Sequence, residues 1–265
     1  MILQLYYASG SLCSQKVKLV LAEKSLDWKG HLVNLLTFEN LAPSYMALNS
    51  KGVVPTLVHN RRVVTDSIRI IQYLDETFPH PPLTPAAPEL QVIMQRWITL
   101  QNQFPMREVM YGNYQGLEGW ILRRSVQIKQ RVLPQLMQAH PELLAFYEAK
   151  LEDVRQWNSS IQDRRAIASI NQKIEPMLTQ LETQLIQTEW LCGTNYSLAD
   201  VVWTAVLNRL EELKFGDLWA NNTRPALAAY FQRLKARPNF KAAIQSDEMP
   251  LSMLLAGLRR TFLGI

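Results

Sequence analysis

The sequence predicts a small α/β domain at the N-terminus, followed by a larger all-α domain. Three observations lead to this prediction. The first 78 residues alternate short apolar runs, which favour strands, with segments of helical period. Five of the fourteen prolines then fall within residues 79–88, and proline-dense segments form stiff linkers that end helices. Beyond residue 88 the apolar positions follow the helical period almost throughout.

The N-terminal elements are expected in the order β-α-β-α-β-β-α. Apolar and β-branched runs predict strands at 2–6, 28–34, 53–58 and 62–65. The last two strands flank His59, Asn60 and Arg61 and predict a β-hairpin. Helices are expected at 14–25 with Ser14 as its cap, near 40–47, and after Asp66 or Ser67. A βαβ unit followed by a ββα unit is a thioredoxin-like arrangement.

The C-terminal part is expected to be helical, with prolines at helix starts, stops or kinks. Its predicted helices are 88–112, 120–138, 141–159, 161–187, 197–214, 224–236 and 238–246. Ser197 as N-cap and Asp200 three residues later form a capping box, which is a structural motif. The expected division is a domain at 1–80, a proline-rich linker at 81–88 and an all-helical domain at 89–265.

Charge and cysteine content exclude several classes of protein. The 28 basic and 23 acidic residues are scattered and give a net charge of +5, so no nucleic-acid partner is expected. Cys13 and Cys192 are too few for a disulfide framework or a four-thiolate zinc site, and the histidines lack metal-site spacing. Neither a signal peptide nor a run of 18 apolar residues is present. The apolar tail at 249–265 predicts either a last helix docked on the core or an interfacial helix that touches a membrane surface or a partner.

Three local motifs carry candidate chemistry. The turn Ser9–Ser14 precedes a helix, where backbone N–H groups stabilise an anion and lower a thiol's pKa. The pair Val54–Pro55 stands before a strand, where a proline is tolerated in either isomer. The pair Asp66–Ser67 at a helix start suits a carboxylate ligand. Each motif also has a purely structural interpretation, as a capping turn or an edge-strand proline.

In this order and spacing, the motifs resemble those of a cytosolic-type glutathione S-transferase over nearly the whole chain. The segments that carry the resemblance are the serine/cysteine turn, VVPTL, Asp66–Ser67, IIQYLDETFP, the proline linker and SLAD. The stretches SLCSQKVKLVLAEK and ALNSKGVVPTLV resemble both zeta-like tetrachlorohydroquinone dehalogenases and the ganglioside-induced differentiation-associated protein family. QNQFPMREVMYG and the lengthened region at 113–170 resemble the latter.

The resemblance implies a detoxifying enzyme that binds glutathione as co-substrate, uses no metal and stabilises the glutathione thiolate. The thiolate would then conjugate or reduce a small, hydrophobic, electrophilic second substrate. A cytoplasmic location and a homodimer are implied by the same likeness. Two alternatives stay open. One is a non-catalytic binding or regulatory protein on the glutathione transferase fold, and the other is a Cys13-based glutathione-dependent thiol oxidoreductase or dehalogenase.

The resemblance also assigns roles to residues. Ser11 is the first choice as hydrogen-bond donor to the thiolate, Cys13 is the alternative through a mixed disulfide, and Tyr7 is a third candidate. The residues implied in glutathione binding are Lys51, Val54, a cis Pro55, Asp66 and Ser67. Those implied at the second-substrate site are Phe104, Met106 and Tyr111, with Gln103 and Tyr114 nearby.

Overall fold

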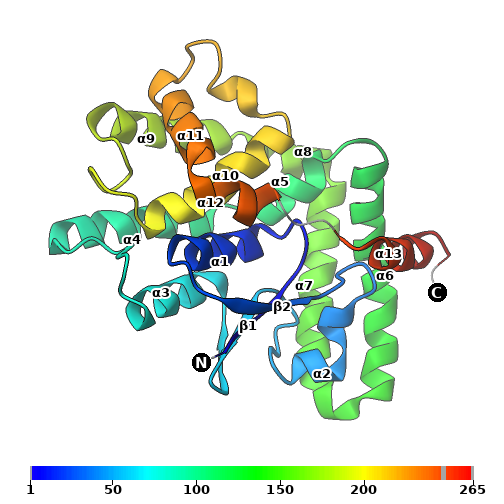
Figure 1. Ribbon diagram of the computed structural model, residues 1–265. Helices are drawn as coiled ribbons and strands as arrows, with labels where there is room; N and C mark the ends of the chain where they lie inside the picture. The colour runs from blue at the N-terminus through cyan, green and yellow to red at the C-terminus, as the bar shows by residue number, and fades with distance from the viewer. Residues whose placement is uncertain (1, 246–248, 264–265) are drawn as a thin grey trace.

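The computed structural model describes residues 2–245 and 249–263 and contains one four-stranded sheet (Figure 1). The strands are β1 (Leu3–Tyr7), β2 (Trp28–Leu32), β3 (Thr56–His59) and β4 (Arg62–Thr65). Their spatial order is β2-β1-β3-β4, with β2 parallel to β1 and the other neighbours antiparallel. This mixed sheet confirms the predicted thioredoxin-like N-terminal half.

The helices of the N-terminal half are α1 (Leu12–Glu23), α2 (Pro43–Met46) and α3 (Ser67–Thr77). Those that follow are α4 (Pro88–Gln103), α5 (Met106–Asn113), α6 (Gly116–Ala139), α7 (Leu144–Gln162), α8 (Arg164–Asn171), α9 (Ile174–Gln187), α10 (Leu198–Glu212), α11 (Pro225–Ala236), α12 (Pro238–Phe240) and α13 (Leu251–Leu263). Short 3₁₀ or π turns occur at Glu39–Leu41, Pro141–Leu143, Gly216–Leu218 and Lys241–Gln245.

Three local expectations for the N-terminal half are corrected by the structure. The N-cap of α1 is Ser11 rather than Ser14, and the Ser14 N–H donates to Ser11 Oγ at 3.3 Å. The hairpin turn has two residues, Asn60 and Arg61, both with positive φ, as the twist of a tight hairpin requires. Strand β3 begins at Thr56, because Pro55 has no N–H to give to the sheet.

Two predicted long helices are each divided into two. The predicted helix 88–112 breaks between α4 and α5 at Phe104 and Pro105, since proline lacks the donor and restricts the residue before it. The predicted helix 161–187 is replaced by α8 and α9. Asp163 ends α7 and starts α8, because its Oδ1 accepts from the N–H groups of Arg165 and Ala166. Of the predicted helix 238–246, residue 246 lies outside the described residues.

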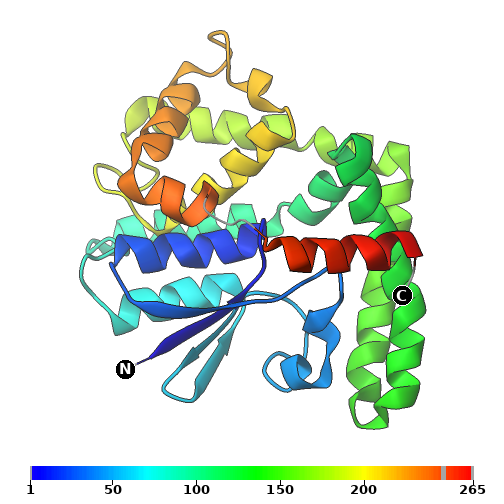
Figure 2. The same cartoon turned by 45° about the vertical axis from the view of Figure 1, so that its right-hand side comes forward.

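The two halves share one hydrophobic core. Helices α1 and α3 lie together on the side of the sheet that faces the helical half, and α1 also packs against α10 (Figure 2). The buried Val17 and Val20 of α1 belong to the same apolar cluster as Val202 and Val206 of α10. Burying this apolar surface fixes α10 against the N-terminal half, so a side chain on α10 can reach the end of β1.

The last helix, α13, crosses α6 beside the loop after β2 (Figure 2). The Asn34 Nδ2 donates to the Met253 carbonyl at 2.8 Å, and the rings of Trp120 and Phe262 lie 5.0 Å apart. The structure therefore favours the docked helix predicted for the tail, of which residues 264–265 lie outside the described part. No helix within the described ranges is long and apolar enough to span a membrane.

Candidate functional site

The sheet register brings the three sequence motifs to one edge. Tyr6 near the end of β1 pairs with Thr56 at the start of β3, and Thr56 pairs with Thr65 at the end of β4. The turn after β1, the Val54–Pro55 pair before β3 and the Asp66–Ser67 pair after β4 are therefore neighbours. Motifs separated by more than 50 residues in sequence form one candidate site.

The turn after β1 presents a hydroxyl and a thiol at the start of α1. Ser11 and Cys13 are both half-buried, and Cys13 is a free thiol. The N–H groups of Leu12 and Cys13 donate to no other described residue, so they are open to an anion at the helix start. Because Ser11 Oγ accepts from the Ser14 N–H, its proton remains to be donated to a ligand.

A buried lysine lies beneath this turn, and sequence reasoning missed it. Lys16 of α1 is only 2% exposed, and its Nζ donates to Gln101 Oε1 of α4 at 2.6 Å. Burial lowers the pKa of Lys16, while the negative charges of ionised Cys13 and Asp66 oppose that shift. Lys16 follows Cys13 by three residues and so shares its helix face. The buried position of Lys16 could have been inferred from the sequence, because this lysine lies within the largely apolar run KVKLVL.

The Val54–Pro55 bond is cis, as the family resemblance implied. Two side chains fix Val53, the residue before this pair, since Tyr45 Oη and Asn49 Nδ2 donate to its carbonyl at 2.7 and 2.8 Å. The N–H and C=O of Val54 make no hydrogen bond to the rest of the described chain. Both groups can therefore pair with an extended ligand, as an unpaired strand edge does.

Asp66 and Ser67 begin α3. Asp66 has a φ of 74° and is exposed, and its Oδ1 caps the helix by accepting from the N–H groups of Ile68 and Arg69. Ser67 is 7% exposed, and its hydroxyl makes no hydrogen bond within residues 2–245 and 249–263. One carboxylate oxygen and one hydroxyl thus remain for a ligand. Lys51 lies on the exposed loop before Val54.

The residues expected around the second substrate lie in several environments. Phe104 is half-buried at the end of α4, and Met106 belongs to the central core. The Tyr111 ring packs edge-on against Trp157 with centroids 4.4 Å apart, and burial raises the pKa of Tyr111 to about 12. None of these three side chains lines the open cavity beside the site.

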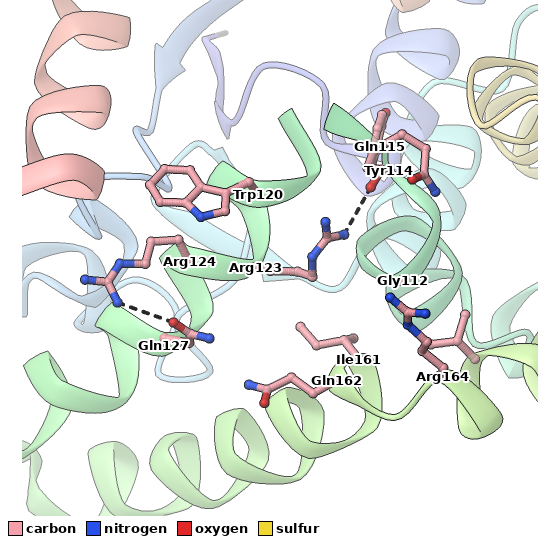
Figure 3. A pocket seen from close by; sticks show the side chains of 11 residues that line it. Gly112, Tyr114, Gln115, Trp120, Arg123, Arg124, Gln127, Ile161, Gln162 and Arg164 are labelled. Carbon is pink, nitrogen blue, oxygen red and sulfur yellow. Dashed lines mark hydrogen bonds between the residues drawn. The ribbon is translucent and has the colours of Figure 1, made fainter. Parts of the chain in front are cut away.

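That cavity has a volume of about 690 Å³ and lies among α5, α6, α7 and α8 (Figure 3). Arg123 and Arg124 extend from α6 and Arg164 from α8, while Trp120 supplies an aromatic wall. Tyr114 is also among its lining residues. No carboxylate is among its lining residues.

Arg209 of α10 connects the cavity to the turn. Its guanidinium donates from Nη1 to Tyr114 Oη and from Nη2 to the Gly10 carbonyl, each at 2.5 Å. Arg209 is 5% exposed and also forms an ion pair with Glu212 at 3.1 Å. Sequence reasoning missed Arg209, because nothing near it in the chain indicates a contact 199 residues away.

The other thiol and the acidic residues do not build a second centre. Cys192 is buried, and burial raises its pKa to about 11, which is typical of an inert structural thiol. Within the described ranges, no group of three or more His, Cys, Asp or Glu residues is placed to hold a metal ion.

The sequence matches two family models. Residues 5–82 match the glutathione S-transferase N-terminal domain, and residues 157–247 match the glutathione S-transferase C-terminal domain. The chain is 32% identical over 243 residues to a tetrachloro-p-hydroquinone reductive dehalogenase of Sphingobium chlorophenolicum, covering 90% of this chain and 94% of the relative. It is 27% identical over 272 residues to the human ganglioside-induced differentiation-associated protein 1-like 1, and the match covers 91% of this chain and 73% of the relative.

Among solved structures, the chain is similar to the beta-etherase LigF from Sphingobium sp. strain SYK-6. The TM-score is 0.75 at 27% sequence identity, and the match covers 92% of this chain and 99% of the other. It is also similar to a theta-class glutathione S-transferase from Xanthomonas axonopodis pv. citri. The TM-score is 0.66 at 20% sequence identity, and the match covers 92% of this chain and 97% of the other. This second likeness concerns the fold alone.

Proposed function

This chain belongs to the glutathione S-transferase family, and its activity depends on glutathione. We propose that it conjugates glutathione to an electrophile by nucleophilic substitution. The observation that carries this proposal is the sheet register, which gathers Ser11, Val54 and Asp66 at one edge. Open hydrogen-bonding groups at that edge match the parts of a γ-glutamyl tripeptide thiol.

Each group has a role in the proposed complex. The Ser11 hydroxyl donates to the glutathione thiolate, and the nearby helix N–H groups add to its stabilisation. The backbone of Val54, before Pro55, pairs with the cysteinyl residue of glutathione. Asp66 and Ser67 bind the γ-glutamyl end, and Lys51 approaches from the loop. Lys16 acts as a positioning residue through its buried charge.

The reaction needs a thiolate at neutral pH. The thiolate attacks the electrophilic carbon, the C–S bond forms, and the bond to the leaving group breaks, so that the group departs as an anion. The thiol's proton goes to solvent. Lowering a thiol pKa from about 8.5 to about 6.5 raises the ionised fraction at pH 7 from roughly 3% to roughly 75%.

Binding to immobilised glutathione and turnover of 1-chloro-2,4-dinitrobenzene test the proposal. Ser11→Ala is expected to lower kcat/KM by about two to three orders of magnitude, as for loss of a donor to a developing anion. The matched control is Ser44→Ala, because Ser44 is an exposed hydroxyl on α2 with no contact to the site. Absence of both binding and turnover at millimolar glutathione refutes the enzyme and leaves a non-catalytic binding protein.

A second candidate is reductive dehalogenation through Cys13. It is favoured by the half-exposed free thiol and by the similarity to a reductive dehalogenase. In this reaction the Cys13 thiolate attacks the glutathione sulfur of the aryl conjugate. The aryl C–S bond breaks, the carbon takes a proton, and a mixed disulfide forms. A second glutathione then releases glutathione disulfide and restores the thiol.

The two reactions separate in the Cys13→Ser variant. With a chlorinated hydroquinone, the variant is expected to accumulate the glutathione conjugate and to form no dehalogenated product. Conjugation of 1-chloro-2,4-dinitrobenzene should fall less than about twofold, since a hydroxyl keeps a similar size at this position. Equal loss of both activities contradicts the division of roles.

Subunit state, location and domain limits extend the proposal. The family relationship supports a cytoplasmic homodimer, with a glutathione-binding domain at 1–80, a linker at 81–88 and a helical domain at 89–265. Light scattering tests the dimer, which should have twice the 30.5 kDa mass of one chain. A mass of one chain across the micromolar range refutes it.

A further inference from the structure

The inner side of the last helix, α13, is docked on the protein. Thr261 is buried, and a Cβ added at Gly257 would lie 2.7 Å from Leu36 in the loop after β2. Met253 is one turn before Gly257 on the same side, and its carbonyl accepts from Asn34 Nδ2 at 2.8 Å. These contacts fix which side of α13 faces outward.

The outer side of α13 is apolar and exposed. Leu251, Leu255 and Phe262 lie within about 40° of one another around the helix axis. They are 70%, 56% and 54% exposed. The surface continues onto α6, because the half-exposed ring of Trp120 lies 5.0 Å from the ring of Phe262. We call these four side chains the outer apolar surface.

The outer apolar surface is a local concentration of exposed apolar residues. Among the described residues, seven of the fourteen large hydrophobic side chains that are exposed lie on α13 or in the first five residues of α6. A helix at the surface normally turns a polar side to water. Neither Figure 1 nor Figure 2 shows another helix or strand of the described chain over the outer side of α13. Exposed apolar patches of this kind mark interaction sites.

The charges that border the outer apolar surface are positive. Arg259 is exposed on the outer side of α13, and the described part of this helix has no Asp or Glu. Arg124 and Arg131 of α6 lie within about 40° of Trp120 around that helix, and Figure 3 shows Trp120 and Arg124 extending to the same side. Glu118 is the one acid of α6, and it lies about 160° away from Trp120.

The other charged groups near α13 are engaged with the protein. The guanidinium of Arg260 lies over the Phe38 ring, 5.1 Å from its centroid. In the loop beneath α13, Glu39 Oε2 accepts from the Asn34 N–H at 2.8 Å. The outward charges are therefore cationic, and they favour an anionic partner.

We propose that the outer apolar surface docks on an anionic lipid bilayer, with α13 parallel to the membrane plane. The 13 residues of α13 extend about 20 Å, which is less than the roughly 30 Å of bilayer hydrocarbon. Its leucines and Phe262 enter the boundary between headgroups and acyl chains, and Trp120 lies at the headgroups. Arg124 and Arg259 approach the lipid phosphates. The inference goes beyond the proposed function and does not depend on glutathione binding.

A second copy of the chain fits this surface less well than a bilayer does. Pairing two outer apolar surfaces would bring Arg124, Arg131 and Arg259 of one copy toward the same arginines of the other. The surface carries no carboxylate among its described residues to compensate this repulsion. An anionic bilayer supplies both the apolar layer and the opposite charge.

Co-sedimentation of the full chain with lipid vesicles tests the inference. The wild type should bind vesicles of equimolar phosphatidylcholine and phosphatidylserine at least about tenfold more tightly than vesicles of phosphatidylcholine alone. L251Q/L255Q should bind the anionic vesicles at least about tenfold more weakly than wild type, because two inserted side chains are lost. The matched control is V92Q/I186Q, which replaces two similarly exposed apolar residues of α4 and α9. Its affinity should stay within about twofold of wild type.

The leucine variant separates docking from general attraction between a basic chain and an anionic surface. L251Q/L255Q keeps the net charge of +5, so purely electrostatic binding would survive it. A second pair, R124Q/R259Q, should bind the anionic vesicles about tenfold more weakly than wild type. Its control, R96Q/K173Q, lowers the net charge equally at exposed positions outside the surface and should weaken binding less than about threefold.

Three results would overturn the inference. The first is no binding of the wild type to anionic vesicles at millimolar lipid. The second is equal binding by wild type, L251Q/L255Q and V92Q/I186Q. The third is a wild type that binds no vesicles while L251Q/L255Q has a lower oligomer mass by light scattering, which would assign the surface to a contact between copies. Vesicle binding is measured without an electrophile, so a wild type that turns over no electrophile refutes the proposed function and leaves this inference to its own test.

Discussion

Replacement of Asp200 by asparagine should destabilise the whole chain. Asp200 is fully buried and accepts four hydrogen bonds. Its Oδ1 accepts from the Leu191 N–H at 3.0 Å and from Tyr230 Oη at 2.8 Å. Its Oδ2 accepts from the N–H and the hydroxyl of Ser197, both at 2.8 Å. The predicted capping box is therefore confirmed and lies at the centre of a larger network.

Asparagine keeps the shape of this carboxylate but has one acceptor oxygen. Its Oδ1 can still accept from Leu191 and Tyr230, and the Ser197 hydroxyl can turn to accept from the new amide. The Ser197 N–H then faces an N–H₂ group and loses its partner, which costs about 1–3 kcal/mol. Converting the remaining charge-assisted bonds to neutral ones adds about 1 kcal/mol. We therefore expect a loss of about 3 kcal/mol in the free energy of unfolding.

For a chain of this size, that loss corresponds to a fall in Tm of about 6–12 °C. Circular dichroism during heating measures it, and urea unfolding gives the free energy. Asp217→Asn is the control, since Asp217 is exposed and contacts no ionic partner in the described part of the chain. Below the transition, glutathione binding should be unchanged in both variants. A fall in Tm of under about 2 °C for Asp200→Asn would refute the hydrogen-bond reasoning.

Three further changes have defined outcomes. Lys16→Met should shift the pH–rate profile of conjugation toward alkaline pH, because a buried positive charge near the thiolate is lost. At pH 6.5 the variant's kcat/KM should be about threefold to tenfold lower than that of the wild type. A pH–rate profile at the wild-type position contradicts this reasoning. Burial lowers the pKa of Lys129 to about 7 in the folded chain. Between about pH 7 and about pH 10.5 the unfolded chain therefore binds more protons at Lys129 than the folded chain does. Because of this difference, the free energy of unfolding of the wild type should rise with pH over that range. Lys129→Met should be more stable than wild type at pH 6 and should flatten this rise, as urea midpoints at pH 6 and 9 would show. Arg209→Leu should raise the KM for glutathione and lower Tm, since the Gly10 carbonyl and Tyr114 hydroxyl lose a buried donor; unchanged kinetics would show that the turn does not need this contact.

Short-range signals made much of the fold predictable. The hairpin, the capping box at Ser197 and the helix after Asp66 depend on residues within a few positions of one another. The break at Pro105 was also visible locally, because a proline inside a helical period removes a donor. Boundaries were less exact, as the shift of the first cap from Ser14 to Ser11 shows.

The sequence by itself determined the thioredoxin-like order of elements, the family motifs and the candidates Ser11, Cys13 and Val54. Only the tertiary structure decided how they meet, because sheet register sets Tyr6 beside Thr56. Contacts between distant segments remain invisible until the core has packed, and the physical reason is that burial, rather than local preference, fixes them. The ammonium of Lys16 finds its acceptor 85 residues away, and Arg209 reaches across 199 residues to the candidate turn.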